Sequence, residues 1–206
     1  MGSCVGCFTD FGSHRISLAM KELQEIYRFI QDIEPLKDTL RTGRTQQGRQ
    51  ESVAEHSWRL AMMAIIIGPK YFPNVDLEKV MRMCLVHDLG EIINGDIPAP
   101  AQKNLSNKSE AERQDFLQVI ASLPKSQTET LIQAWDEYEA AATQEAKLVK
   151  ALDKLETIIQ HNQGNDEPEF DHAFDLTYGQ QYMDLDPVVK ALRKLVDHDT
   201  KEKVRS

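Results

Sequence analysis

Apolar residues recur with the period of an α-helix along most of the sequence, and this pattern limits the possible folds more than any other feature. Residues 18–33, "LAMKELQEIYRFIQDI", place apolar side chains at every third or fourth position, and Pro35 follows. No segment shows the alternation of apolar and polar residues that is typical of a half-buried strand. We therefore predict an all-α protein.

Capping signals divide this pattern into successive helices. Ser52 and Glu55 have the spacing of a capping box before the apolar stretch "HSWRLAMMAIIIG". Asp76 can cap one continuous helix over residues 77–93, Thr143 can cap the helix that contains "LVKALDKLE", and Asp186 precedes a last helix. The connections are expected to be irregular at residues 41–50, 96–108 and 162–185.

The length of 206 residues, 41% of them hydrophobic, is sufficient for one compact domain. We expect residues 20–206 to form this domain and residues 1–19 to be a flexible extension. Cys4 and Cys7 lie in the extension and Cys84 lies in an apolar run, so no disulfide framework is indicated. The sequence shows no signal peptide and no membrane span, and we expect a reducing, cytoplasmic location.

The net charge of -9 argues against two classes of partner. Nucleic acid polymers and anionic membranes both attract basic surfaces, so neither is an expected partner. A small phosphorylated substrate is not excluded, because it needs only a local cluster of arginines.

Ionisable residues occupy four positions where a helix pattern calls for apolar ones. His56, His87 and Asp153 each continue an apolar helix face, and Asp88 directly follows His87. Burial of two carboxylates and two imidazoles is costly unless a cation neutralises them. Two nitrogen and two oxygen ligands suit Mn, Fe, Co or Zn better than Mg or Ca. We therefore predict that these four residues bind one divalent metal ion in the core.

The order His56, His87-Asp88, Asp153 resembles the H…HD…D signature of the HD-domain metal-dependent phosphohydrolases. The strings "ESVAEHSWRLAMMA", "HDLGEIINGDIPAP" and "LVKALDKLE" are similar to the 5′-deoxynucleotidase branch, including the group called HD-domain-containing protein 2. The resemblance implies a single HD domain folded as an all-helical bundle, one divalent metal, and hydrolysis of deoxynucleoside 5′-monophosphates to nucleosides and phosphate. It also implies a homodimer.

Further site residues follow from the same motifs. Glu91 is expected one helical turn beyond His87, where it could orient the attacking water or pass a proton to the leaving 5′-oxygen. By resemblance, Asp96 belongs to the active site and either meets the sugar hydroxyl or assists proton transfer. Arg41 matches the substrate arginine of the family, and its planar fork suits a phosphate group.

Four other positions in or near these motifs are not assigned to catalysis or metal binding. Thr42 stands where some bacterial members have a tryptophan that can pack on the nucleotide, so the base contacts and the base preference are left open. Trp58 is expected to pack in the core. Lys154 and Glu156 are read as supporting or structural residues, not as catalytic ones.

The sequence leaves two alternatives to a deoxynucleotidase. The first is another enzyme of the same fold. An enzyme with two metal ions is disfavoured, because such sites need additional histidines and residues 89–152 contain none. Hydrolysis of (p)ppGpp stays open, because it needs only one metal. The second is a regulatory module that binds metal or nucleotide without catalysis. The presence of all four expected ligands and of Glu91 favours an enzyme.

Overall fold

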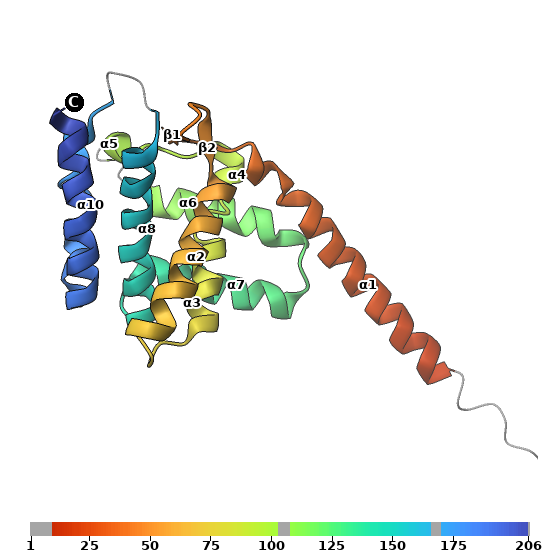
Figure 1. Cartoon of the computed structure of the whole chain (residues 1–206). Helices are drawn as coiled ribbons and strands as arrows, with labels where there is room; N and C mark the ends of the chain where they lie inside the picture. The colour runs from red at the N-terminus through yellow and green to blue at the C-terminus, as the bar shows by residue number, and fades with distance from the viewer. Residues whose placement is uncertain (1–9, 103–107, 166–169, 206) are drawn as a thin grey trace, which may run out of the picture.

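The computed structural model describes residues 10–102, 108–165 and 170–205, and it confirms the all-α class (Figure 1). The α-helices are α1 (Asp10–Asp32), α2 (Val53–Tyr71), α3 (Leu77–Val86), α4 (Glu91–Asn94), α5 (Ala99–Gln102), α6 (Lys108–Val119), α7 (Lys125–Ala140), α8 (Gln144–Gln163), α9 (His172–Asp175) and α10 (Pro187–Arg205). Short 3-10 helices lie at Glu34–Lys37, Ile120–Ser122 and Gln180–Leu185.

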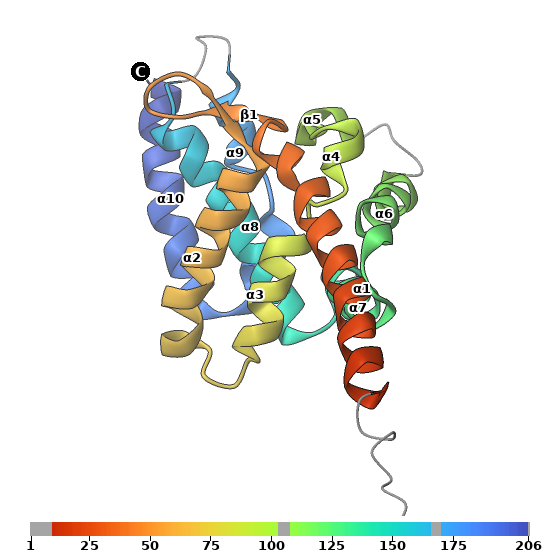
Figure 2. The same ribbon diagram turned by 90° about the vertical axis from the view of Figure 1, so that its right-hand side faces the viewer.

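Helix α8 forms the centre of the bundle. Helices α2, α3, α7 and α10 all pack against it, so it is enclosed on several sides (Figures 1 and 2). Many of its apolar side chains are fully buried as a result, among them Leu148, Leu152, Leu155 and Ile158. Several polar residues of α8, among them Asp153, Glu156 and Thr157, are buried as well, and buried polar groups need partners.

The predicted caps begin the helices that lead to the site. The Ser52 hydroxyl accepts a hydrogen bond from the Glu55 backbone N–H at 3.2 Å, and the Glu55 carboxylate accepts one from the Ser52 N–H at 2.9 Å. This confirms the capping box of α2. Asp76 caps α3 and Thr143 caps α8, each through its side-chain oxygen, as predicted.

The continuous helix predicted over residues 77–93 is wrong. Helix α3 ends at Val86, residues 87–90 form turns, and α4 begins separately at Glu91. A Cβ atom on Gly90 would lie 2.8 Å from the Glu112 carbonyl oxygen, so only glycine allows α4 to pack this closely against α6. Glu91 therefore lies at the start of a separate helix and not in the last turn of α3.

A short antiparallel hairpin was missed by the sequence analysis. Strands β1 (Leu40–Arg44) and β2 (Gln50–Ser52) pair with Leu40 opposite Ser52 and Arg44 opposite Gln50. Both strands are short and polar, so they lack the apolar alternation that identifies a strand. The Gln160 side chain of α8 donates to the Arg44 carbonyl oxygen at 2.5 Å and ties β1 to the bundle.

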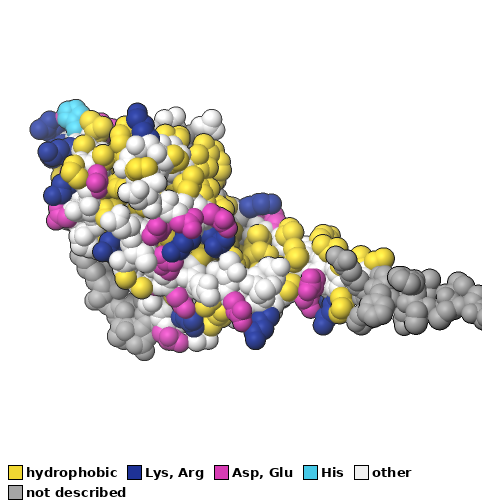
Figure 3. Space-filling model, turned by 90° about the horizontal axis from the view of Figure 1, so that it is seen from below, with side chains coloured by type: hydrophobic (Ala, Val, Ile, Leu, Met, Phe, Trp, Pro, Cys, Tyr) yellow, Lys and Arg dark blue, Asp and Glu magenta, His cyan; other side chains and the backbone are white. Residues whose placement is uncertain are grey.

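Helix α1 extends away from the bundle at its N-terminal end (Figure 1). It begins at Asp10, so the domain boundary expected at residue 20 falls inside a helix, and residues 10–19 are helical. Figure 3 shows apolar side chains along this projecting arm. The large exposed ones are Ile16, Leu18, Met20, Leu23, Tyr27 and Ile30. The expectations for residues 1–9, which include Cys4 and Cys7, lie outside the described residues.

Candidate active site

Three helices bring the four predicted metal ligands together. His56 lies in the first turn of α2, His87 and Asp88 follow the end of α3, and Asp153 lies midway along α8. His56 Nε2 lies 3.3 Å from Asp153 Oδ1 and 3.7 Å from Asp88 Oδ2. His87 Nε2 lies 3.0 Å from the same Asp88 oxygen. Residues far apart in the sequence therefore present their side chains to one point.

The donor atoms of this cluster fit a divalent metal ion. His56, His87 and Asp88 offer ligand atoms that all lie within 4.8 Å of one another. The Nε2 atoms of both histidines are buried, and neither has a hydrogen-bond partner among the residues that the structure describes. Such unsatisfied nitrogens are costly in a protein interior, and a cation between them and the carboxylates would satisfy both. The mixed nitrogen and oxygen set is typical of transition-metal sites.

The second nitrogen of each imidazole fixes its orientation. His87 Nδ1 lies 3.1 Å from the Cys84 carbonyl oxygen, which can only accept, so Nδ1 carries the proton and Nε2 keeps its lone pair. His56 Nδ1 contacts the buried carboxylate of Glu156, which also accepts from Arg59 Nε at 2.6 Å. Both rings therefore turn Nε2 toward the cluster, as metal binding requires.

Asp153 is held by one of its two oxygens. The Tyr138 hydroxyl donates to Oδ2 at 2.7 Å, and Lys154 Nζ lies 2.9 Å from the same atom. Burial opposes ionisation of this carboxyl, but Lys154 and His56 outweigh it and hold its pKa well below the ordinary value. Asp153 is therefore an ionised carboxylate whose other oxygen faces His56.

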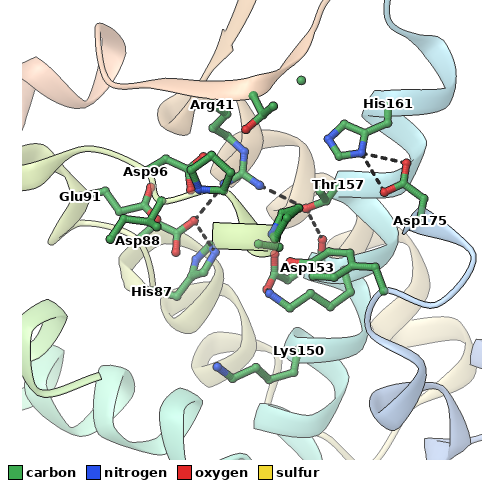
Figure 4. Close-up of a pocket in the computed structure, with 18 of the residues that line it drawn as sticks. Arg41, His87, Asp88, Glu91, Asp96, Lys150, Asp153, Thr157, His161 and Asp175 are labelled. Carbon is green, nitrogen blue, oxygen red and sulfur yellow. Dashed lines mark hydrogen bonds and ion pairs between the residues drawn. The ribbon is translucent and has the colours of Figure 1, made fainter. Parts of the chain in front are cut away.

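Arg41 reaches the cluster from β1 (Figure 4). Its Nη1 lies 3.4 Å from Asp88 Oδ2, its Nη2 donates to Thr157 Oγ1 at 3.1 Å, and its Nε lies 3.5 Å from Glu51 Oε2. Only 12% of its side chain is exposed, so Arg41 belongs to the site interior rather than to a solvated loop. By contrast, Arg44 donates to the Gly48 carbonyl oxygen at 2.7 Å within the hairpin.

Glu91 and Asp96 lie beside Asp88 on the opposite side of the site from α8 (Figure 4). Burial and the neighbouring carboxylates of Asp88 and Asp96 raise the pKa of Glu91 to about 9. A carboxyl group with that pKa holds its proton at neutral pH and can donate it. One Glu91 oxygen is buried without a hydrogen-bond partner among the described residues, so it remains available to a bound molecule.

A cavity of about 360 Å³ connects these groups, a size that suits a small-molecule ligand. His87, Asp88, Asp153 and Arg41 line it, and Figure 4 shows Arg41 between Asp88 and His161. The end away from the metal ligands is formed by His161 of α8 and by side chains of the segment around α9. The predicted catalytic, substrate and metal residues thus all border this cavity or, in the case of His56, lie behind it.

The sequence analysis read Glu156 as a supporting or structural residue, but it missed the supporting contacts of Tyr138 and Trp135 and misplaced Trp58. Glu156 orients His56, and Trp135 of α7 donates its indole N–H to the His87 carbonyl oxygen at 3.1 Å. The position of Glu156, one turn after Asp153 on the same buried helix, was the available signal for the first of these contacts. Trp58 is not a core residue, because 64% of it is exposed on α2.

Fold and site together define a helical protein with a buried histidine and aspartate centre that suits a divalent metal. The sequence model of the HD domain matches residues 33–193, and the chain belongs to the HD-domain family. The human protein named 5′-deoxynucleotidase HDDC2 is 32% identical over 145 residues, which cover 69% of this chain and 70% of the human one.

Two further likenesses span more of the chain. A Dictyostelium discoideum protein with the same name is 31% identical over 180 residues, covering 81% of this chain and 93% of its own. A solved structure from Magnetospirillum magnetotacticum, described as a predicted metal-dependent phosphohydrolase, matches with a TM-score of 0.76 and 28% identity. That match covers 90% of this chain and 94% of the bacterial one, so the fold is shared nearly from end to end.

Proposed function

We propose that this protein is a metal-dependent 5′-deoxynucleotidase, which hydrolyses deoxynucleoside 5′-monophosphates to deoxynucleosides and phosphate. One observation carries the proposal: His56 and His87 direct buried Nε2 atoms, unpartnered among the described residues, at the carboxylates of Asp88 and Asp153 beside a cavity that contains Arg41. The names of the human and Dictyostelium relatives support the substrate class.

The metal ion is assigned to His56, His87, Asp88 and Asp153. Mn, Co, Fe or Zn fits this donor set better than Mg, which prefers oxygen ligands. When bound, such an ion supplies a water of lowered pKa and offsets charge on the phosphoryl oxygens. The chain itself supplies rigid ligands, since His56 and His87 are each held through Nδ1 and Asp153 is held through Oδ2.

Arg41 is assigned to the phosphate of the substrate. Its guanidinium lies 3.4 Å from Asp88 and is largely shielded from water, so its charge acts strongly on an anion bound beside the metal ligands. Glu51 lies against Nε and Thr157 accepts from Nη2, which together keep the planar fork directed into the cavity. A phosphate can take up two of its N–H groups at once.

Glu91 is assigned to proton donation to the leaving 5′-oxygen. Departure of a deoxynucleoside requires a proton on that oxygen, and the raised pKa of Glu91 makes this side chain a suitable acid at neutral pH. Asp96 assists because its charge is among those that keep Glu91 protonated. A hydrogen bond from the sugar hydroxyl to Asp96 is compatible with its place on the cavity wall.

The test is phosphate release from a panel of deoxynucleoside monophosphates, ribonucleoside monophosphates and ppGpp. The protein is stripped with a chelator and reloaded with Mn, Co, Fe, Zn or Mg in turn. We expect turnover of the deoxynucleotides in at least one transition metal and weaker turnover in Mg. Turnover of ppGpp alone would replace the proposal with (p)ppGpp hydrolysis. Metal and nucleotide binding without any turnover would favour a regulatory module.

The remaining expectations stay predictions. These are the cytoplasmic location, the absence of nucleic acid and membrane partners, the homodimer, and the assignment of residues 20–206 to a single domain. Within the described residues, none of the helices is both long enough and apolar enough to cross a bilayer.

A further inference from the structure

The end of the cavity away from the metal ligands has an aromatic wall. Phe170, Phe174 and Tyr178, which lie in and around α9, all line the cavity and are only partly buried. The Phe174 and Tyr178 rings lie 5.5 Å apart at an angle of 31°. The Phe170 ring meets the His161 ring edge-on at 4.6 Å. These side chains therefore present apolar ring surface to whatever enters this end.

The wall is held in place from behind. His161 Nδ1 lies 3.0 Å from an oxygen of Asp175, whose carboxylate is buried. Arg193 of α10 donates to the Asp175 carbonyl oxygen at 2.7 Å and to the Tyr178 carbonyl oxygen at 2.6 Å. Figure 4 shows His161 and Asp175 together at the side of the cavity away from Glu91. The segment after α8 is thereby fixed to the bundle although it contains little regular structure.

The spacing along α8 relates the two ends of the cavity. Asp153, Thr157 and His161 are four residues apart in turn, so they follow one face of the helix over about 12 Å. Asp153 belongs to the proposed metal centre, and Thr157 binds Arg41. A substrate whose phosphate lies against Arg41 at the metal centre can therefore extend along this face to His161.

We propose that this aromatic end binds the nucleobase of the substrate, an inference that rests on the proposed nucleotidase function. Bases stack on aromatic rings irrespective of sequence, because every base has a π-face. Strand β1 also borders this end, because a Cβ atom on Gly43 would lie 3.0 Å from His161 Cδ2. The ring surface of Phe174 thus supplies the stacking contact that Thr42, on β1, cannot offer. The Tyr178 ring supports Phe174 from the side of Lys154, whose Nζ lies 5.3 Å from the Tyr178 ring centroid.

The experiment measures binding rather than turnover. Metal-loaded protein is titrated calorimetrically with a deoxynucleoside 5′-monophosphate analogue in which a methylene group replaces the bridging 5′-oxygen, and with the same analogue lacking the base. We expect the base to improve the Kd of the wild type by tenfold or more. In Phe174→Leu, which keeps apolar bulk but removes the ring, the improvement should fall severalfold. Phe174→Tyr, which keeps a ring, should retain most of it.

Two further variants control the result. Trp58→Ala removes an exposed aromatic ring from α2, outside the cavity, and should leave the base contribution unchanged. Ile97→Ala alters the cavity wall beside Asp96. A base contribution lost in Ile97→Ala and kept in Phe174→Leu would overturn the proposal, as would equal wild-type affinity for the two analogues. If the base improves binding but the protein hydrolyses no deoxynucleotide, the proposed nucleotidase function is overturned and the proposed base-binding site is not.

Discussion

The two ends of the cavity are built in opposite ways. At the metal end, the side chains come from α2, from α8 and from the turn after α3. His56, His87 and Asp153 are almost completely buried, and each has a second contact that fixes its direction. At the aromatic end, the side chains come from a four-residue helix and its flanks and are only partly buried. Ligands that must meet one ion need precise placement, whereas a stacking surface tolerates variation.

Because of this difference, the metal end should determine the chemical step and the aromatic end should determine the affinity for the substrate. A change at the metal end disturbs groups that depend on one another, so it should affect metal content and the rate of the chemical step. A change at the aromatic end should affect affinity alone. Arg41 lies between the two and should show an intermediate behaviour. The predictions below examine this division, beginning with the largest effect.

Asp88→Ala should abolish both metal binding and activity. The substitution removes a carboxylate that lies within ligand distance of both histidines and leaves their buried Nε2 atoms without an anionic neighbour on that side. Elemental analysis after reloading should show metal near background, and phosphate release should be undetectable. Asp199→Ala, on the exposed face of α10, is the matched control and should behave as wild type. Full metal content in Asp88→Ala would remove Asp88 from the ligand set.

Glu91→Gln should keep the metal and lose turnover by a factor of about 10² to 10⁴, the usual contribution of general acid–base catalysis. The amide has the size of the acid but cannot give its proton to a leaving oxygen. Metal content and the Kd of the substrate analogue should change little. Equal loss of metal in Glu91→Gln and Asp88→Ala would contradict the division of roles between these residues.

Arg41→Lys should raise KM by about 10-fold to 100-fold, in line with the loss of charged hydrogen bonds. Lysine keeps the charge near Glu51 and Asp88, so folding should be preserved, but it cannot present two parallel N–H groups to a phosphate. Steady-state kinetics with a deoxynucleotide and the same measurement on Arg44→Lys, in the hairpin, provide the comparison. An unchanged KM would remove Arg41 from the substrate site.

Glu156→Gln should weaken metal affinity by about tenfold, the lower end of the effect seen when groups behind metal ligands are altered. Glutamine can still accept a hydrogen bond from His56 Nδ1, but it no longer carries the charge that pairs with Arg59. Competition with a chelator of known affinity gives the value. An affinity equal to that of the wild type would reduce Glu156 to a packing role.

The helical class and the capped helix starts were predictable because their causes are local. Periodic apolar residues and the oxygens of Ser52, Asp76 and Thr143 act within one or two turns of the chain. The break between α3 and α4 was not predictable in this way. It depends on the backbone of α6 lying against Gly90, a contact between segments that sequence periodicity does not reveal.

The same reasoning applies to the site. The clustering of His56, His87 and Asp153 was predictable because ionisable residues on apolar helix faces conflict with burial, and the conflict is visible in the sequence; Asp88 was included because it directly follows His87. The aromatic end carries no such conflict, since Phe170 and Phe174 look like ordinary packing residues. Only the fold shows that they border a cavity. The exposed position of Trp58 was missed because an apolar helix does not reveal which of its faces is covered.

Cys84 lies one turn before His87, completely buried in α3, and burial raises the pKa of its thiol to about 12. An alkylating reagent reaches this thiol only when α3 separates from α8, so the rate of labelling at Cys84 measures how often the native core opens. Peptide mapping distinguishes this cysteine from the two near the N-terminus. Since a bound ion stabilises the closed state, adding metal should slow the labelling of Cys84. The ratio of the labelling rates without and with metal gives the free energy of metal binding without any substrate.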